Sequence, residues 1–140
     1  MKIDHFKYHE RGMNRFFGPL EARVMTILWD NTELTIKDVQ HQLGLHQDKP
    51  LSFNTVMTVM NRLVDKGFLH KLPGRKASSY RPTRSREQFL EDQSKELTGE
   101  LLEEFGPLIV NHMVDALDEA DPNLLDQLEK RIQQLKKDRS

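Results

Sequence analysis

The side chains best suited to molecular recognition lie within residues 52–69 of this 140-residue chain. An apolar stripe that begins at Val56 and ends at Leu63, with spacings of three and four, predicts a helix with one buried face. The opposite face carries short hydrogen-bonding groups and a guanidinium, where an ordinary solvated helix would carry a mixture of Glu and Lys. Such groups can bond to base edges and phosphates without filling a DNA groove. The candidate contact residues are Ser52, Asn54, Thr55, Thr58, Asn61 and Arg62.

The ends of this helix are also marked in the sequence. The hydroxyl of Ser52 can accept a hydrogen bond from an unpaired backbone N–H of the first turn, and Gly67 can adopt the left-handed conformation that ends a helix. We interpret the segment as a recognition helix for DNA. A polar surface helix of an unrelated domain is the alternative that this segment alone leaves open.

A short basic hairpin is predicted after the helix. Residues 68–72 are compatible with a strand, Pro73-Gly74 is a strong turn signal, and residues 80–82 form a returning strand that ends at a proline. The tip contains Arg75, Lys76 and Ser78, whose charges and hydroxyl suit the phosphate backbone. A hairpin of this kind beside a helix-turn-helix is a wing.

Two earlier helices must position the recognition helix. Gly18-Pro19 predicts the start of the first, and Thr35 with Asp38 predicts a capping box at the start of the second. The connection from the second helix to the third, residues 45–51, is longer than in a minimal helix-turn-helix, as winged variants allow. We expect a mainly α fold with a small β-hairpin, in which a winged helix-turn-helix domain precedes a helical region.

The charge of the chain divides near Ser85. Residues 1–86 carry 15 Lys and Arg against 8 Asp and Glu, a net +7, whereas residues 87–140 carry 6 against 14, a net −8. A basic half fits a polyanionic partner, and an acidic half would repel one. The chain has no cysteine, no signal-peptide pattern and no apolar run long enough for a membrane span, so we expect a cytoplasmic protein without direct membrane insertion.

The acidic half is predicted to form three helices. Ser85 can cap a long one over residues 86–105, Gly106-Pro107 breaks it, and Asp121-Pro122 begins the last. Their apolar side chains have no obvious body to bury against, so pairing with a second copy is the economical solution, and folding back onto the winged domain is the alternative. The residues expected at the dimer interface are Phe89, Leu97, Leu101, Phe105, Ile109, Met113, Leu117, Leu128, Ile132 and Leu135.

Three regions follow from these patterns. Residues 18–84 form the predicted winged-helix DNA-binding domain and residues 85–140 the predicted helical dimerisation region. Residues 1–17 show no clear period, and their aromatic and basic side chains fit either a flexible arm that reaches DNA or a segment packed on the body.

Four segments together resemble a known family. Residues 18–82 closely resemble the BlaI/MecI family of penicillinase and methicillin-resistance repressors. The resemblance rests on the segments GPLEARVMTILWD, LTIKDVQHQL, LSFNTVMTVMNRLVDKGFL and YRP. The resemblance continues more loosely through the C-terminal helices. It implies a winged-helix domain followed by a three-helix dimerisation region, and homodimers that bind palindromic operators in double-stranded DNA and repress nearby promoters.

The resemblance also implies a mode of release. In the antibiotic-resistance members a membrane sensor-protease triggers cleavage at an Asn–Phe bond in an apolar helix of the dimerisation region. The matching position is Asn111-His112, where histidine replaces the phenylalanine. A copper-responsive branch of the family ends in paired cysteines, and this chain has none, so that mode of sensing is not supported.

The remaining patterns predict no catalytic or metal centre. The six histidines show no HExxH or comparable spacing, and no phosphate-binding loop or nucleophile motif is present, so we predict neither an enzyme nor a cofactor. Two other functions stay open: a winged-helix module that binds protein through its acidic helices, and a winged-helix regulator that senses a ligand or metal.

Overall fold

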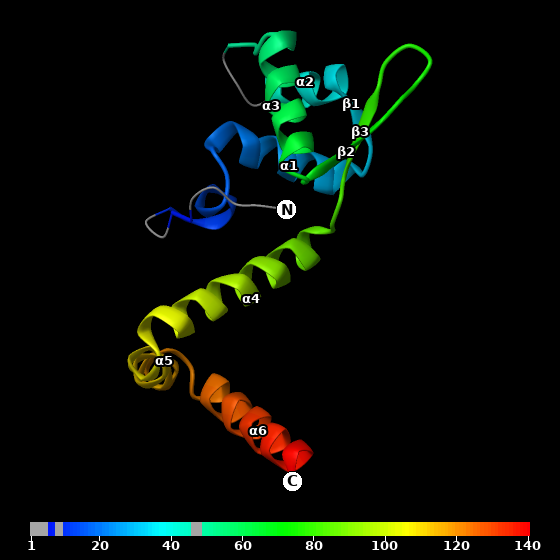
Figure 1. Ribbon diagram of the computed structural model, residues 1–140. Coiled ribbons are helices and arrows are strands. Elements are labelled where there is room, and N and C mark those ends of the chain that lie inside the picture. Colours follow the sequence, from blue (N-terminus) through cyan, green and yellow to red (C-terminus); the bar gives the residue numbers. More distant parts are fainter. Residues whose placement is uncertain (1–5, 8–9, 46–48) are drawn as a thin grey trace. The chain divides into compact units, whose positions relative to one another are not determined.

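The computed structural model describes residues 6–7, 10–45 and 49–140 (Figure 1). The chain divides into two compact units, Met1–Phe89 and Leu90–Ser140. The division falls within helix α4, Arg86–Phe105, a few residues after the boundary expected near Ser85. The first turn of this helix therefore belongs to the N-terminal unit.

The N-terminal unit is a winged helix-turn-helix. Its helices are the 3-10 turn η1 (Gly12–Arg15), α1 (Pro19–Asn31), α2 (Ile36–Gly44) and α3 (Phe53–Asp65). Its strands are β1 (Leu34–Thr35), β2 (Leu69–Leu72) and β3 (Ser79–Pro82). The predicted order of three helices followed by a hairpin is confirmed.

Local capping chemistry fixes where the helices begin. The Thr35 hydroxyl accepts a hydrogen bond from the Asp38 backbone N–H at 3.2 Å, and the Asp38 carboxylate accepts one from the Thr35 N–H at 3.0 Å, so the predicted capping box is present. Ser52 caps α3 by accepting from the Thr55 N–H at 3.1 Å. The backbone of Gly67 has a φ of 85°, in the left-handed region, immediately after the last turn of α3.

The sheet contains one strand more than the predicted hairpin. The strand order is β1-β3-β2 and both pairings are antiparallel, with Leu34 opposite Tyr80 and Lys71 opposite Tyr80 on the other side. The predicted hairpin of β2 and β3 is confirmed, and β1 adds a third strand that the sequence did not predict. A strand of two residues is too short to show an alternating pattern in the sequence. Its pairing with β3 also depends on residues far away in the sequence.

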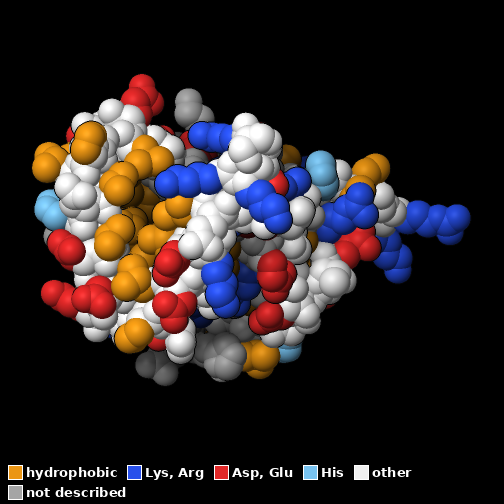
Figure 2. All heavy atoms as spheres, turned by 90° about the horizontal axis from the view of Figure 1, so that it is seen from below, with side chains coloured by type: hydrophobic (Ala, Val, Ile, Leu, Met, Phe, Trp, Pro, Cys, Tyr) orange, Lys and Arg blue, Asp and Glu red, His pale blue; other side chains and the backbone are white. Residues whose placement is uncertain are grey.

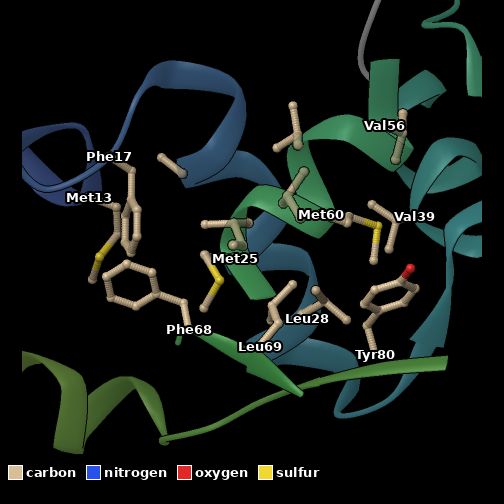
Figure 3. Close-up of a cluster of buried hydrophobic side chains, with 14 of the residues drawn as sticks. Met13, Phe17, Met25, Leu28, Val39, Val56, Met60, Phe68, Leu69 and Tyr80 are labelled. Atoms are coloured by element: carbon tan, nitrogen blue, oxygen red, sulfur yellow. The ribbon is translucent and has the colours of Figure 1, made fainter. Parts of the chain in front are cut away.

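The core of this unit lies between the three helices and one face of the sheet (Figure 3). α1 contributes Val24, Met25 and Leu28, and the sheet contributes Leu69 and Tyr80, all at most 1% exposed. The start of α1 is also tied to the end of α3 by an ion pair of 3.4 Å between Glu21 and Lys66. The end of α3 is thus held against the start of α1.

The described part of the N-terminal segment is packed rather than free. Met13 is 9% and Phe17 is 3% exposed, and both lie in the core of the unit (Figure 3). Of the two interpretations of residues 1–17, burial of Met13 and Phe17 favours packing on the body for residues 10–17. Residues 1–5, 8 and 9 lie outside the described residues.

Phe89 does not lie where the sequence suggested. This side chain, in the first turn of α4, is fully buried in the N-terminal unit. Its ring lies 5.3 Å from the ring of Phe17, 5.9 Å from that of Phe68 and 5.4 Å from that of Trp29, measured between centroids. Its assignment to a dimer interface is corrected, because these aromatic contacts leave none of its surface for a partner chain.

The C-terminal unit consists of the rest of α4 with α5 (Pro107–Ala120) and α6 (Pro122–Arg139). The predicted break at Gly106-Pro107 and the predicted start at Asp121-Pro122 are confirmed. Neither α5 nor α6 has a buried residue. Large apolar side chains such as Phe105, Leu108 and Met113 are 44%, 62% and 49% exposed.

Candidate nucleic-acid interface

The recognition helix α3 has the two faces that its sequence predicts. The buried face is confirmed, because Val56 and Leu63 are fully buried and Val59 is 7% exposed. On the other side, Asn54 and Arg62 are exposed, as are Ser52, Thr55 and Thr58. The structure thus brings most of the predicted contact residues together on one solvent-exposed surface.

Some of these polar groups already have partners inside the helix. The hydroxyls of Ser52 and Thr55 lie 2.8 Å apart, and the Thr58 hydroxyl donates to the Asn54 carbonyl at 2.8 Å. Among the described residues, the side chains of Asn54 and Arg62 form no hydrogen bond or ion pair. Asn54 and Arg62 are therefore the side chains on α3 most available to an external partner.

Asn61 has a position different from the rest of the predicted set. Its side chain is half-buried, and its carboxamide oxygen accepts a hydrogen bond of 3.0 Å from the Tyr80 hydroxyl. Because Tyr80 lies on β3, this bond joins the recognition helix to the base of the wing. The carboxamide nitrogen forms no hydrogen bond within the described residues and can still donate.

The wing presents the predicted basic tip. Arg75 and Lys76 are exposed and Ser78 is half-buried. A Cβ atom at Gly74 would collide with the Ala77 carbonyl oxygen, so the turn needs glycine there. Figure 2 shows Lys and Arg side chains in blue on the part that projects to the right, on the side where Figure 1 places the wing.

The base of the wing is held by contacts of side chains on β2 and β3. Ser79 donates a hydrogen bond of 2.9 Å to the Glu33 carboxylate, which ties β3 to the residue before β1. The Lys71 ammonium lies 5.9 Å from the centre of the Tyr80 ring. These contacts leave the tip to extend while the strands stay attached to the helices.

A groove of about 450 Å³ lies between the start of α2, the face of α3 and the wing. Its lining includes the cations Lys37, Lys71 and Lys76 and the apolar side chains Phe53 and Met57. Of these, only Lys76 belongs to the predicted contact set. The others were missed because their meeting depends on how α2 and the wing pack on α3, which no local pattern encodes.

The start of α2 carries a carboxylate with a lowered pKa. The pKa of Asp38 is lowered from its ordinary value, because the backbone N–H and the hydroxyl of Thr35 donate hydrogen bonds that favour its charged form. Asp38 therefore stays ionised and acts in the capping box.

The predicted dimer residues, apart from Phe89, are partly or largely exposed in the C-terminal unit. Phe105, Ile132 and Leu135 are between 42% and 44% exposed. Figure 2 shows hydrophobic side chains in orange gathered on one face, beside acidic side chains in red. The residues of this set that are half-buried are Leu97, Leu101, Ile109, Leu117 and Leu128.

An apolar cavity of about 230 Å³ opens between the three helices of the C-terminal unit. Its lining is almost entirely aliphatic and includes Leu101, Ile109 and Ile132. Asn111 and His112, the predicted cleavage position, lie in the middle of α5 with exposed side chains. A protease would have to unwind α5 locally to reach the peptide bond between them.

Two further observations concern metal binding and membrane-spanning helices. Within residues 6–7, 10–45 and 49–140, no three His, Asp or Glu side chains lie close enough together to hold a metal ion. In the same part of the chain, no helix combines the length and the apolar character needed to cross a bilayer.

Comparison with known proteins gives the relationship of this chain. The sequence profile of a family described as "Penicillinase repressor" matches residues 17–134, which is most of the chain and includes both units. The chain belongs to the penicillinase repressor family. The resemblance inferred from residues 18–82 is thereby confirmed, and the family match extends through α5 into α6.

Two curated relatives are similar over a shorter stretch. Each is named transcriptional regulator BlaI, from Mycobacterium tuberculosis strains CDC 1551 / Oshkosh and ATCC 25618 / H37Rv, and is 35% identical over 74 residues. The match includes 52% of this chain and 52% of the relative, so the chain spans about half the length of the curated relatives it matches.

Two solved structures have some likeness in fold. The complex structure of hsRosR-S1 is 15% identical with a TM-score of 0.48, over 92% of this chain and 100% of that one. The structure of TrmBL2, described as an archaeal chromatin protein with a novel mode of DNA binding, is 21% identical with a TM-score of 0.43. That match includes 75% of this chain and 38% of the TrmBL2 chain.

Proposed function

We propose that this chain is a DNA-binding transcriptional repressor that acts as a homodimer on a palindromic operator. The observation that carries the proposal is the exposed polar face of α3, where Asn54 and Arg62 have no partner among the described residues, beside a wing whose tip carries Arg75 and Lys76. Membership of the penicillinase repressor family and the +7 charge of residues 1–86 support it. Such a protein would work in the cytoplasm, where the chromosome is.

The two basic elements would have different roles. Helix α3 would lie in the major groove, where an Asn side chain can pair with adenine and an Arg side chain with guanine. Arg75 and Lys76, at the end of an exposed hairpin, would neutralise phosphates and add affinity that does not depend on sequence. Asn61 would be held in place for a base contact by Tyr80.

Selection of binding sites from a random duplex pool tests the DNA-binding part of the proposal. We expect the purified protein to enrich a palindromic consensus, and Asn54→Ala to change the preferred base at one position of each half-site. Glu96→Ala, an exposed change on α4, is the control and should enrich the wild-type consensus. A pool without enrichment would contradict sequence-specific binding.

The homodimer is proposed to form through the C-terminal unit. This unit buries no residue of α5 or α6, and its apolar side chains remain between 38% and 62% exposed at positions such as Val114 and Leu108. Burying that surface against a second copy removes apolar area from water at roughly 25 cal/mol per Å². The acidic charge of residues 87–140 would repel the DNA phosphates from this unit and leave DNA binding to the basic N-terminal unit.

Sedimentation velocity tests the dimer. Phe105→Glu and Met113→Glu place a charge on apolar positions that are 44% and 49% exposed, so they should yield monomers that remain folded. Glu104→Gln, next to Phe105 and exposed, is the matched control and should remain dimeric. A monomeric wild-type protein at micromolar concentration would rule out the dimer.

We further propose that cutting α5 releases the repressor. A cut between Asn111 and His112 would divide the helix that lines the apolar cavity with α4 and α6, and so weaken the dimer surface. A recognition sequence for a site-specific protease, placed around Asn111 and His112 so that the apolar side chains of Ile109 and Met113 are kept, allows the cut to be made in vitro. The uncut variant must first dimerise and bind the operator as the wild type does. The cleaved protein should lose dimerisation and operator binding together, and retention of both after complete cleavage would contradict this mode of release.

A further inference from the structure

We propose that Phe53 and Met57 recognise the methyl group of a thymine in the target DNA; this deepens the proposed function and rests on it. Phe53 is the first residue of α3 and is 40% exposed, while Met57, one turn later, is half-buried. The same helix has a separate buried stripe, from Val56 to Leu63, that packs against the core. Phe53 and Met57 are apolar side chains outside that stripe, and they line a groove together with Asn61, one of the candidate base contacts.

The surroundings of the two side chains point to a nucleic-acid strand. Phe53 and Met57 line the same groove as Lys37, Lys71 and Lys76, and no carboxylate lines it. The three cations come from α2, β2 and the tip of the wing, so positive charge surrounds an apolar centre on several sides. A DNA strand has the complementary character, with phosphates outside and, at thymine, an apolar methyl group that projects into the major groove.

The position of Phe53 on the helix agrees with this assignment. The N-terminal residues of a recognition helix are those that reach base edges in helix-turn-helix proteins. Asn54 follows immediately with an exposed carboxamide, which suits adenine. The expected half-site therefore contains at least one thymine at a fixed distance from the dyad, contacted through its methyl group and not only through its hydrogen-bonding edge.

Uracil substitution isolates the methyl group. Each thymine of a selected operator is replaced in turn by uracil, which keeps the hydrogen-bonding edge and lacks only the 5-methyl group, and binding of the full-length protein is measured by gel shift. We expect a loss of about fourfold at one or two positions of each half-site, the amount that burial of one methyl group represents. Replacing any other thymine by uracil should leave the affinity unchanged.

The variants assign the effect to residues. Phe53→Ala should bind the thymine and uracil duplexes equally well, and Met57→Ala should reduce the difference between them. Leu45→Ala, which changes an apolar side chain that is 59% exposed and does not line the groove, should keep the full difference. Circular dichroism of each variant checks that it is folded.

Three results would overturn the proposal. If the wild-type protein binds every uracil duplex as tightly as the thymine duplex, it makes no contact with a thymine methyl group. That result would not contradict the proposed repressor function. Full uracil sensitivity in both Phe53→Ala and Met57→Ala places the contact on other residues. If no duplex is bound sequence-specifically and an acidic apolar peptide binds over Phe53 instead, both this inference and the proposed function are wrong.

Discussion

The hydrogen bond between Tyr80 and Asn61 connects the stability of the fold to its proposed specificity. Tyr80 is 1% exposed, and its hydroxyl donates to the Asn61 carboxamide oxygen at 3.0 Å. Tyr80→Phe removes the tyrosine hydroxyl and keeps the ring in the core. A hydrogen bond of this kind contributes roughly 0.5–1.5 kcal/mol net, and the half-buried position of Asn61 lets water replace part of it. We therefore expect a loss of about 1 kcal/mol, or about fivefold in the folding equilibrium constant.

The effect on DNA binding should be selective. Without the Tyr80 hydroxyl the Asn61 carboxamide loses the partner that fixes its orientation, so any base contact that it makes is weakened. A well-made pair between a side chain and a base contributes roughly 1–3 kcal/mol of discrimination, which sets the upper limit of the loss. Affinity for unrelated DNA should stay the same, because the wing and its cations are unchanged.

Urea denaturation followed by circular dichroism gives the stability, and gel shifts on the selected operator and on a scrambled duplex give the specificity. Ser79→Ala is the control, because it removes another hydrogen bond from the same strand, to Glu33, and should change stability without changing specificity. In a double-mutant cycle, Asn61→Ala should add little to Tyr80→Phe. If Tyr80→Phe leaves both stability and specificity unchanged, the bond has neither of the roles assigned to it.

Three further changes test other parts of the structure. Arg75→Ala and Lys76→Ala should each lower the slope of log affinity against log salt by about 1.8 on every sequence, because a dimer loses two phosphate contacts at roughly 0.9 each; an unchanged slope would mean that the wing does not contact phosphates. Phe89→Ala should destabilise the N-terminal unit by roughly 3–5 kcal/mol, since the ring is fully buried, and should leave the dimer intact in sedimentation. Asp38→Asn should be less stable than wild type at pH 7, because the folded carboxyl has a lowered pKa and contributes stability above its unfolded value. In pH-dependent urea denaturation that difference should shrink as the pH falls below about 4, and a difference that grows with acid would contradict the capping role.

Features that depend on neighbours in the sequence were predicted well. The helix starts at Pro19, Thr35 and Ser52 follow from local caps, and the break at Gly106-Pro107 follows from backbone constraints. The polar face of α3 was also recognised, because a period of 3.6 residues separates the two faces of a helix without knowledge of the fold.

Features that depend on distant parts of the chain were missed or misplaced. The strand β1 exists only through its pairing with β3. Phe89 shares the periodicity of its helix but is buried by the aromatic rings of Phe16, just after η1, Trp29 in α1 and Phe68, just before β2. The groove beside α3 likewise combines Lys37, Phe53 and Lys71 from separate elements. Tertiary packing determines where these residues lie, and the spacing of residues in the sequence carries no information about that packing.

The central claim is that two copies of α3 lie in the major groove of one operator. Hydroxyl-radical footprinting on the selected operator, with sedimentation of the same complex to count chains, tests it most directly. The account predicts two protected stretches related by a dyad, one helical turn or a small multiple apart, and two chains per duplex. One chain on a single protected stretch, or uniform protection without a dyad, would contradict it.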